Sequence, residues 1–266
     1  LERALAALHG KEAALVFSSG YVANQTAIST IAQLLPDCLI LSDSDNHNSM
    51  IEGVREALTL AFNFELINSA LNGGALPRIA SYYSNSQLSG DVASPASGRV
   101  LELLTPFAAD LPPGTIEGYA LPVSDGSEAN RKNLRRAMGL LEDAGWTVTN
   151  GQLVNAAGVP FSFEILLQNG SDDMIATANI YIEALKRLGI FARVQTVDAA
   201  MYKERVNEFK CDMTYILRAL SLSPGNEQRL YWGAEQADQS GSRNLPGIKS
   251  PADRKSTRLN SSHLGI

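Results

Sequence analysis

Residues 161–217, FSFEILLQNGSDDMIATANIYIEALKRLGIFARVQTVDAAMYKERVNEFKCDMTYIL, decide the fold class of this chain. The stretch contains three apolar runs of strand length, at 161–167, 191–197 and 211–217. Between them lie two segments of helical periodicity, at 171–188 and 199–207. Strands that alternate with helices favour a parallel sheet, so we expect an α/β fold with βαβαβ order.

Upstream of this stretch the pattern is less regular. Apolar residues at helical spacing predict a helix over 130–144 that ends at Gly145. Residues 152–168 are expected to form a hairpin with its turn at 155–158. Residues 72–126 are rich in Ser, Gly and Pro, and they are expected to be irregular and to wrap a larger body.

The first 68 residues repeat the rhythm of strand and helix with short loops. The expected strands are 13–17 and 38–41, and the expected helices are 1–9, 22–35 and 54–68. This part of the chain therefore also predicts an α/β layer.

Composition excludes several classes of protein. The 266 residues carry a net charge of −6, with 45% hydrophobic and 19% charged residues, which is unlike collagen, disordered chains or disulfide-rich domains. No apolar run approaches the roughly 20 residues that cross a bilayer. The mild acidity argues against a nucleic-acid partner. Three scattered histidines and the distant Cys38 and Cys211 predict no metal site.

One turn near the N-terminus suits an anion. Residues 18–21, Ser-Ser-Gly-Tyr, stand between an expected strand and an expected helix. Backbone N–H groups and the positive end of a helix dipole favour a phosphate there, although a plain helix cap explains the same residues. His47 follows the second expected strand, where it either stacks on a flat ring or is an ordinary loop residue.

Three runs decide between these interpretations. They are LHGKEAA at 8–14, FSSGYVAN at 17–24 and NHNSMIEG at 46–53. Residues 1–53 thereby resemble the 5-aminolevulinate synthases, a pyridoxal-phosphate (PLP) dependent family. The resemblance implies a fragment of an aspartate aminotransferase-like large domain in this region.

The same resemblance assigns cofactor residues. Gly20 and Tyr21 would lie beside PLP, and His47 would stack on its pyridine ring. No later residue matches the family's Schiff-base lysine or the aspartate that pairs with the pyridinium nitrogen. Because that amine prepares the cofactor for substrate, we expect no catalytic residues and no productive PLP binding.

A second resemblance begins at residue 54. It rests on VREALTLAFNFE at 54–65, LSLSPGNEQ at 220–228, YWG at 231–233 and GSRNL at 241–245. These runs resemble the family 5 extracellular solute-binding proteins, which deliver peptides and similar solutes to ABC importers. Residues 54–252 would then be a fragment, mainly the C-terminal lobe, of a periplasmic-binding-protein fold with no cofactor.

The resemblance places Arg218, Ser221 and Asn226 on the stretch that lines the solute cleft. Arg218 would pair with a carboxylate through its planar guanidinium, or else form an ordinary interlobe salt bridge. Tyr231 and Trp232 would contact the solute or belong to the core.

Residues 253–266 resemble a translated sequencing adapter, so we interpret them as a non-native tail. The whole chain is then expected to be a chimera, with its junction near Gly53. We expect an incomplete, inactive fragment of an importer's substrate-binding component, whose partners would be an oligopeptide-like solute and an inner-membrane ABC permease. The alternative is a fragment of 5-aminolevulinate synthase. The solute-binding part would be periplasmic, and the synthase part cytoplasmic.

Overall fold

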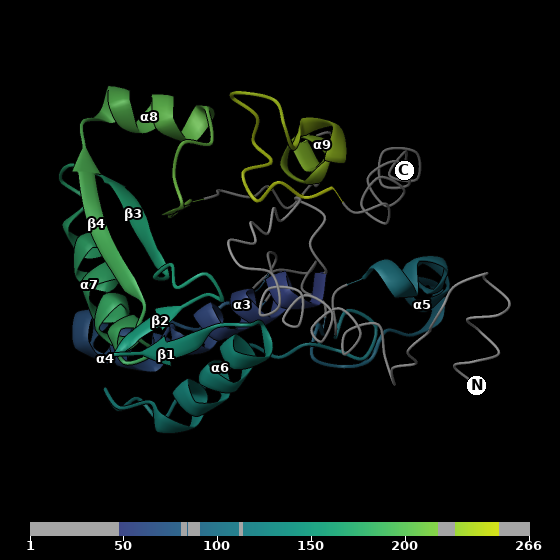
Figure 1. Cartoon of the computed structure of the whole chain (residues 1–266). Helices are drawn as coiled ribbons and strands as arrows, with labels where there is room; N and C mark the ends of the chain where they lie inside the picture. Colours follow the sequence, from purple (N-terminus) through teal and green to yellow (C-terminus); the bar gives the residue numbers. More distant parts are fainter. Residues whose placement is uncertain (1–47, 81–83, 85–90, 112–113, 218–226, 250–266) are drawn as a thin grey trace, which may run out of the picture.

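The computed structural model describes residues 48–80, 84, 91–111, 114–217 and 227–249 (Figure 1). The helices are α3 (Asn48–Ala61), α4 (Phe64–Asn72), α5 (Gly98–Leu104), η1 (Thr105–Asp110), α6 (Arg131–Asp143), α7 (Asp172–Lys186), α8 (Ala199–Asn207), α9 (Glu227–Trp232) and η2 (Ala234–Gln236). The strands are β1 (Thr147–Thr149), β2 (Gln152–Val154), β3 (Ser162–Gln168), β4 (Phe191–Val197) and β5 (Met213–Thr214). The elements expected before residue 48 lie outside the described residues.

A parallel sheet with the strand order β4-β3-β5 organises the molecule, which confirms the predicted α/β class and βαβαβ order. In its register Ile165 lies opposite both Val194 and Met213. Successive side chains of a strand point to opposite faces. Tyr181 and other apolar residues of α7 pack with Ile165, whereas Tyr202 of α8 bonds to Thr214, so α7 and α8 cover opposite faces (Figure 1).

The main core lies between this sheet, α7 and the pair α3–α6. Its most deeply buried members are aliphatic side chains of these elements, of β2 and of the connection from α7 to β4, namely Leu60, Leu141, Leu153, Leu185, Leu188 and Ile190. Burying such side chains is worth about 1.5–3 kcal/mol each. Gly189 joins α7 to β4 at φ +77°, and a Cβ there would lie 2.7 Å from the Leu153 nitrogen. Only glycine permits this close approach of α7 to the hairpin.

The single helix predicted over 54–68 is wrong, because the chain forms two helices separated at Phe62 and Asn63. The Asn63 side chain accepts a hydrogen bond from the Leu66 nitrogen at 3.0 Å and caps α4. Its amide group also donates to the Ser127 carbonyl at 2.8 Å. A contact with a residue 64 positions away therefore fixes the break.

The hairpin predicted over 152–168 is confirmed only around its turn. The observed hairpin pairs β1 with β2 through Asn150 and Gly151, both at positive φ, as tight hairpin turns require. Residues 155–158 do form a turn, but only one bridge, Val154 to Pro160, continues the antiparallel pairing. The predicted second arm is β3, which pairs in parallel with β4 and β5.

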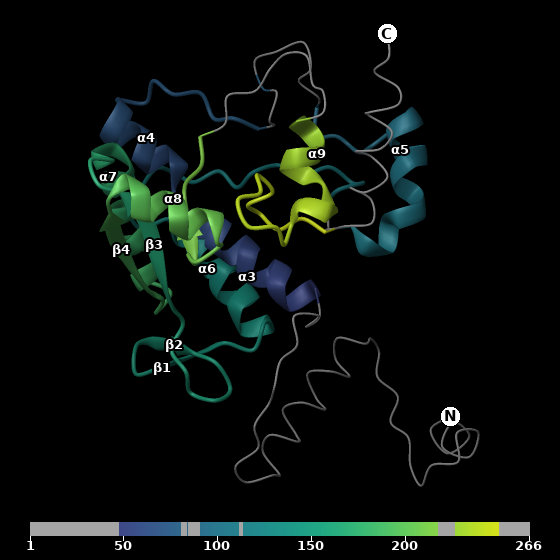
Figure 2. The ribbon, with the colours of Figure 1, turned by 90° about the horizontal axis from the view of Figure 1, so that it is seen from above.

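The described parts of 72–126 are irregular as predicted, apart from α5 and η1. Gly118 lies against the backbone of Ala93, and the Tyr119 nitrogen donates to the Val92 carbonyl at 2.8 Å. In both ribbon views α5 lies on the opposite side of the molecule from α4 and α7 (Figures 1 and 2). The part of this segment around α5 therefore extends away from the core of the lobe.

Candidate functional site

The strand order places a topological switch point between β3 and β5. The connection through α7 leads from β3 to β4 on one side, and the connection through α8 crosses back to β5 on the other. In open α/β sheets, ligands bind outside the carboxyl ends of strands at such a point. The sheet thus indicates where to look for a site.

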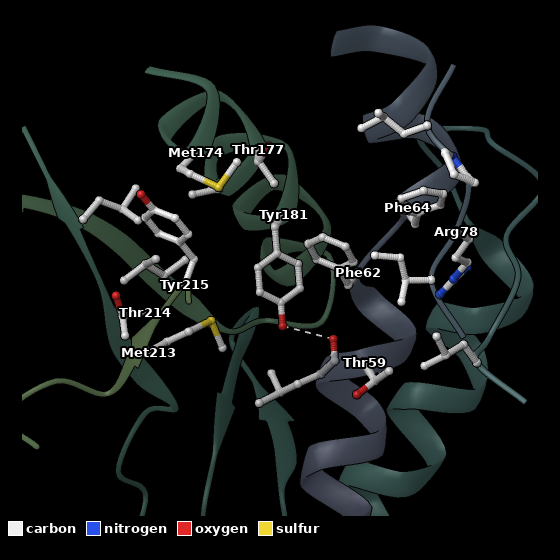
Figure 3. Close-up of a pocket in the computed structure, with 18 residues that line it drawn as sticks. Thr59, Phe62, Phe64, Arg78, Met174, Thr177, Tyr181, Met213, Thr214 and Tyr215 are labelled. Carbon is white, nitrogen blue, oxygen red and sulfur yellow. Dashed lines mark hydrogen bonds between the residues drawn. The ribbon is translucent and has the colours of Figure 1, made fainter. Parts of the chain in front are cut away.

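A cavity of about 770 Å³ opens at this place (Figure 3). Its walls come from the end of α3, the start of α4, residues 76–79, α7, and the carboxyl ends of β3 and β5. Apolar side chains form most of the wall, including Leu58, Phe62, Ile165, Leu167, Met174 and Met213. The volume lies in the range of about 300–1,000 Å³ that is typical of ligand pockets.

Tyr181 stands at the centre of the wall (Figure 3). Its hydroxyl donates to the Leu58 carbonyl at 3.0 Å, and its ring contacts Phe62 edge-on with centroids 5.5 Å apart. Burial raises the pKa of Tyr181, so the phenol stays protonated and remains a hydrogen-bond donor at neutral pH. Tyr181 therefore joins α7 to the end of α3 at the cavity wall.

The charge at the cavity wall is paired. Arg78 Nη1 lies 2.7 Å from Glu65 Oε1, and the guanidinium lies 5.2 Å from the centroid of the Phe64 ring. Burial acts to raise the pKa of Glu65, but hydrogen bonds from Ser124 and the charge of Arg78 outweigh it and hold that pKa below its usual range. The pair is therefore ionised at neutral pH.

The lining residues, all of which the structure describes, include no lysine, histidine, cysteine or carboxylate. The cavity thus offers no amine for a Schiff base with PLP, and the cofactor does not fit here. Cys211 lies outside the lining, and burial, the largest influence, raises the pKa of its thiol. Across the part of the chain that the structure describes, no group of three or more His, Cys, Asp or Glu side chains could hold a metal ion.

The residues predicted for the two sites fall largely outside the described part of the chain. Gly20, Tyr21 and His47 and, in the second site, Arg218, Ser221 and Asn226 are outside the described residues, so their roles stay predictions. The second set follows shortly after Tyr215, which lines the cavity. Tyr231 and Trp232 contact each other edge-on in α9, with centroids 6.4 Å apart, and neither lines the cavity.

The sheet is parallel, has helices on both faces and carries an apolar cavity at the carboxyl ends of its strands. These features are typical of a ligand-binding α/β lobe. The chain belongs to the bacterial extracellular solute-binding proteins of family 5, whose model for the middle region matches residues 45–239. This confirms the family that residues 54–252 were predicted to resemble. No helix in the described ranges is long and apolar enough to cross a membrane.

Named relatives agree with the family. A protein of Brucella melitensis is 42% identical over 200 residues, which cover 75% of this chain and 32% of that protein. The "Probable peptide-binding protein YejA" of Agrobacterium fabrum is 39% identical over 201 residues, with the same coverage of 75% and 32%. The chain thus spans about a third of the length of these relatives.

A solved structure shares the fold. The oligopeptide-binding protein AppA of Bacillus subtilis, in complex with a nonapeptide, superposes with a TM-score of 0.53 and 25% identity. The match covers 78% of this chain and 35% of AppA. Like the sequence relatives, it is far longer than the shared region.

The N-terminal residues match a different family. Residues 1–66 match the model of the class I and II aminotransferases. The overlap of the two family matches, 45–66, includes the predicted junction near Gly53. Both the chimera and the adapter-like tail stay predictions.

Sequence reasoning missed the cavity itself. Thr177 and Tyr181 look like ordinary positions of an amphipathic helix, and residues 76–79 are part of an irregular stretch. The signal that could have located the cavity is the βαβαβ order. When the third strand of such a unit returns to pair with the first, the sheet has a switch point where ligands bind. Sequence reasoning instead placed the site a few residues beyond β5.

Proposed function

We propose that residues 54–252 are part of the C-terminal lobe of a periplasmic substrate-binding protein for oligopeptides or related solutes. The observation that carries the proposal is the family match, which runs through the whole described lobe from α3 to η2. The likeness to a nonapeptide complex and to a relative named as peptide-binding supports a peptide solute. The protein's further partner would be an inner-membrane ABC permease.

The geometry supports binding rather than chemistry at this site. The cavity offers apolar wall and a neutralised ion pair, which suit retention of a solute. Arg218, Ser221 and Asn226, which follow β5 in the sequence, would contact the solute. Because the matched region is about a third of each relative, we propose that these residues alone hold a solute only weakly.

A graft tests the proposal. Residues 54–252 would replace the matching third of the Agrobacterium fabrum relative, and the purified hybrid would be titrated calorimetrically with a peptide mixture that the parent binds. We expect the hybrid to bind peptides within about tenfold of the parent, equivalent to about 1.4 kcal/mol. A hybrid that unfolds cooperatively, like the parent, but binds no peptide would overturn the proposal.

A second candidate concerns residues 1–53. The aminotransferase match over 1–66 favours a PLP-synthase fragment, joined to the lobe in a chimera. We propose that this part is inactive, because no matching Schiff-base lysine follows it. The purified chain mixed with PLP should lack the visible absorbance band of a protein-bound Schiff base, and borohydride should fix no cofactor.

The chimera has its own test at the level of nucleic acid. Long-read sequencing of the source DNA across the codons for residues 45–65 and 250–266 would show whether one molecule spans each junction. We expect no spanning molecule. A read that crosses both junctions would establish the fusion and exclude an adapter-derived tail.

A further inference from the structure

We infer that the cavity at the carboxyl ends of β3 and β5 is a specificity pocket for uncharged, apolar side chains of the peptide solute, aliphatic or aromatic. The inference rests on the proposed function and deepens it. It follows from three features of the described residues: the hydrogen bonds already made at the wall, the pairing of its one charge, and the edge of β5 with which no described residue pairs.

Two hydroxyl groups of the wall are already engaged. Thr59 donates to the Arg55 carbonyl at 2.8 Å. The Tyr181 hydroxyl donates a hydrogen bond to the Leu58 carbonyl. A polar group that entered the cavity would lose water and find few donors, which costs about 1–3 kcal/mol.

The one charged group of the wall is already paired. Arg78 is paired with Glu65 at 2.7 Å through Nη1, and only 22% of its side chain is exposed. An acidic side chain of the solute would share the guanidinium with the like charge of Glu65, whereas a basic one would meet the like charge of Arg78. Both signs of charge are therefore disfavoured relative to an apolar side chain.

The position of the cavity suits an extended peptide. Among the described residues β5 pairs only with β3, and none of them pairs with its second edge. A peptide that adds to such an edge places alternate side chains on the two faces of the sheet. Met213 and Tyr215 line the cavity beside that edge, so one set of side chains would enter it.

Methionine methyl groups report on the cavity directly. Met174 and Met213 line it, whereas Met138 of α6 packs on the core and Met201 is 46% exposed on α8. The full chain with 13C-methyl methionine would be titrated by NMR with N-acetyl-phenylalaninamide, N-acetyl-leucinamide and N-acetyl-lysinamide. We expect Met174 and Met213 to shift with the first two probes, and about tenfold less affinity for the lysine probe.

Two variants locate the site. Thr177→Phe adds a ring to the cavity wall and should abolish the shifts, while Thr149→Phe on the exposed strand β1 should leave them unchanged. Native positions of the Met138 and Met201 resonances show that each variant is folded. Should Thr177→Phe fail to fold, Thr177→Leu fills less of the space and should weaken binding in the same direction.

The outcomes separate this inference from the proposed function. The pocket inference is overturned if the lysine probe shifts Met174 and Met213 as much as the apolar probes do. It is also overturned if Thr177→Phe leaves those shifts intact, or if neither methionine shifts with any probe. The peptide-binding function is judged independently by the grafted protein. A graft that binds peptides without preferring apolar residues sustains the function and overturns the pocket.

Discussion

The two faces of the β4-β3-β5 sheet use alternate residues of the same strands, yet one face is closed and the other is hollowed. On the face covered by α8, called the α8 face here, Leu166 is fully buried and Thr214 is bonded to Tyr202. On the opposite face, called the cavity face, Leu167 and Met213 border the cavity beside α7. Neighbouring residues of β3 thus face a closely packed side of the sheet and a side that borders a cavity.

Directional polar contacts explain the closed face. Arg205 of α8 lies 2.9 Å from Glu164 of β3 and donates to the Gln195 side chain of β4 at 2.9 Å. Its Nε also donates to the Lys210 carbonyl at 2.9 Å. These bonds fix α8 across the strands, whereas α7 meets the sheet mainly through apolar packing. The cavity lies on the apolar face.

The largest expected effect comes from truncating neighbouring leucines on the two faces. Leu166→Ala should cost about 2–5 kcal/mol of unfolding free energy, because it creates a void at a fully buried position. Leu167→Ala should cost at least about 1 kcal/mol less, since that side chain already borders a cavity. Urea denaturation of both variants measures the difference, and equal losses would contradict the contrast between the faces.

A smaller loss is expected from the polar contacts of the α8 face. Glu164→Gln removes the charge that faces Arg205 and Arg193, and the Glu164 side chain is only 12% exposed. We expect a loss of about 1–2 kcal/mol in urea denaturation. The matched change Glu183→Gln breaks an exposed pair with Lys186 and should cost less than about 0.5 kcal/mol. Equal losses for the two variants would show that the contacts of Glu164 stabilise the fold no more than an exposed ion pair does.

Local signals predicted the elements that close the α8 face. β4 and α8 have the bounds expected from the sequence, and the Asp198 side chain caps α8 by accepting from the nitrogens of Ala200 and Met201. The same reasoning failed at Asn63, because its contacts with Ser124 and Ser127 come from distant sequence. Long-range pairing likewise placed β3 in the sheet rather than in a hairpin.

The cavity was harder to predict than the fold. Its wall combines five separate parts of the chain, within 58–64, 76–79, 121, 165–181 and 213–215, which meet only after α4, α7 and β5 have packed. Nothing in the sequence around Thr177 or Arg78 distinguishes a lining residue from a surface one. The resemblance to a family directed attention to Arg218, which lies outside the described residues. A void is a property of packing, so no local pattern encodes it.

The hydrogen bond across the cavity wall gives the third contrast. Tyr181→Phe removes the bond to the Leu58 carbonyl and should cost about 1 kcal/mol in urea denaturation. The matched change Tyr202→Phe removes the contact with Thr214 on the α8 face. We expect Tyr181→Phe alone to alter the Met174 and Met213 methyl resonances. A change at Met201 instead would show that the bond acts on the other face.

The smallest expected effect concerns the ion pair between Glu65 and Arg78 beside the cavity. Its contribution to stability should depend on pH. The pKa of Glu65 lies below its usual value of 4.5, so ionised Glu65 stabilises the folded state above that pH. This contribution is lost as pH falls through the lowered pKa. Glu65→Gln should therefore cost about 0.5 kcal/mol at neutral pH, and the difference from the parent should vanish in acid.

Urea denaturation at a series of pH values measures that difference. The control is Glu102→Gln, which breaks an exposed pair with Arg99 on α5, far from the cavity. It should show almost no difference from the parent at any pH, because water screens both partners. If Glu65→Gln instead lowers stability by the same amount in acid and at neutral pH, its charge does not stabilise the wall. The apolar preference of the cavity would then depend on side-chain packing alone, without help from a neutralised Arg78.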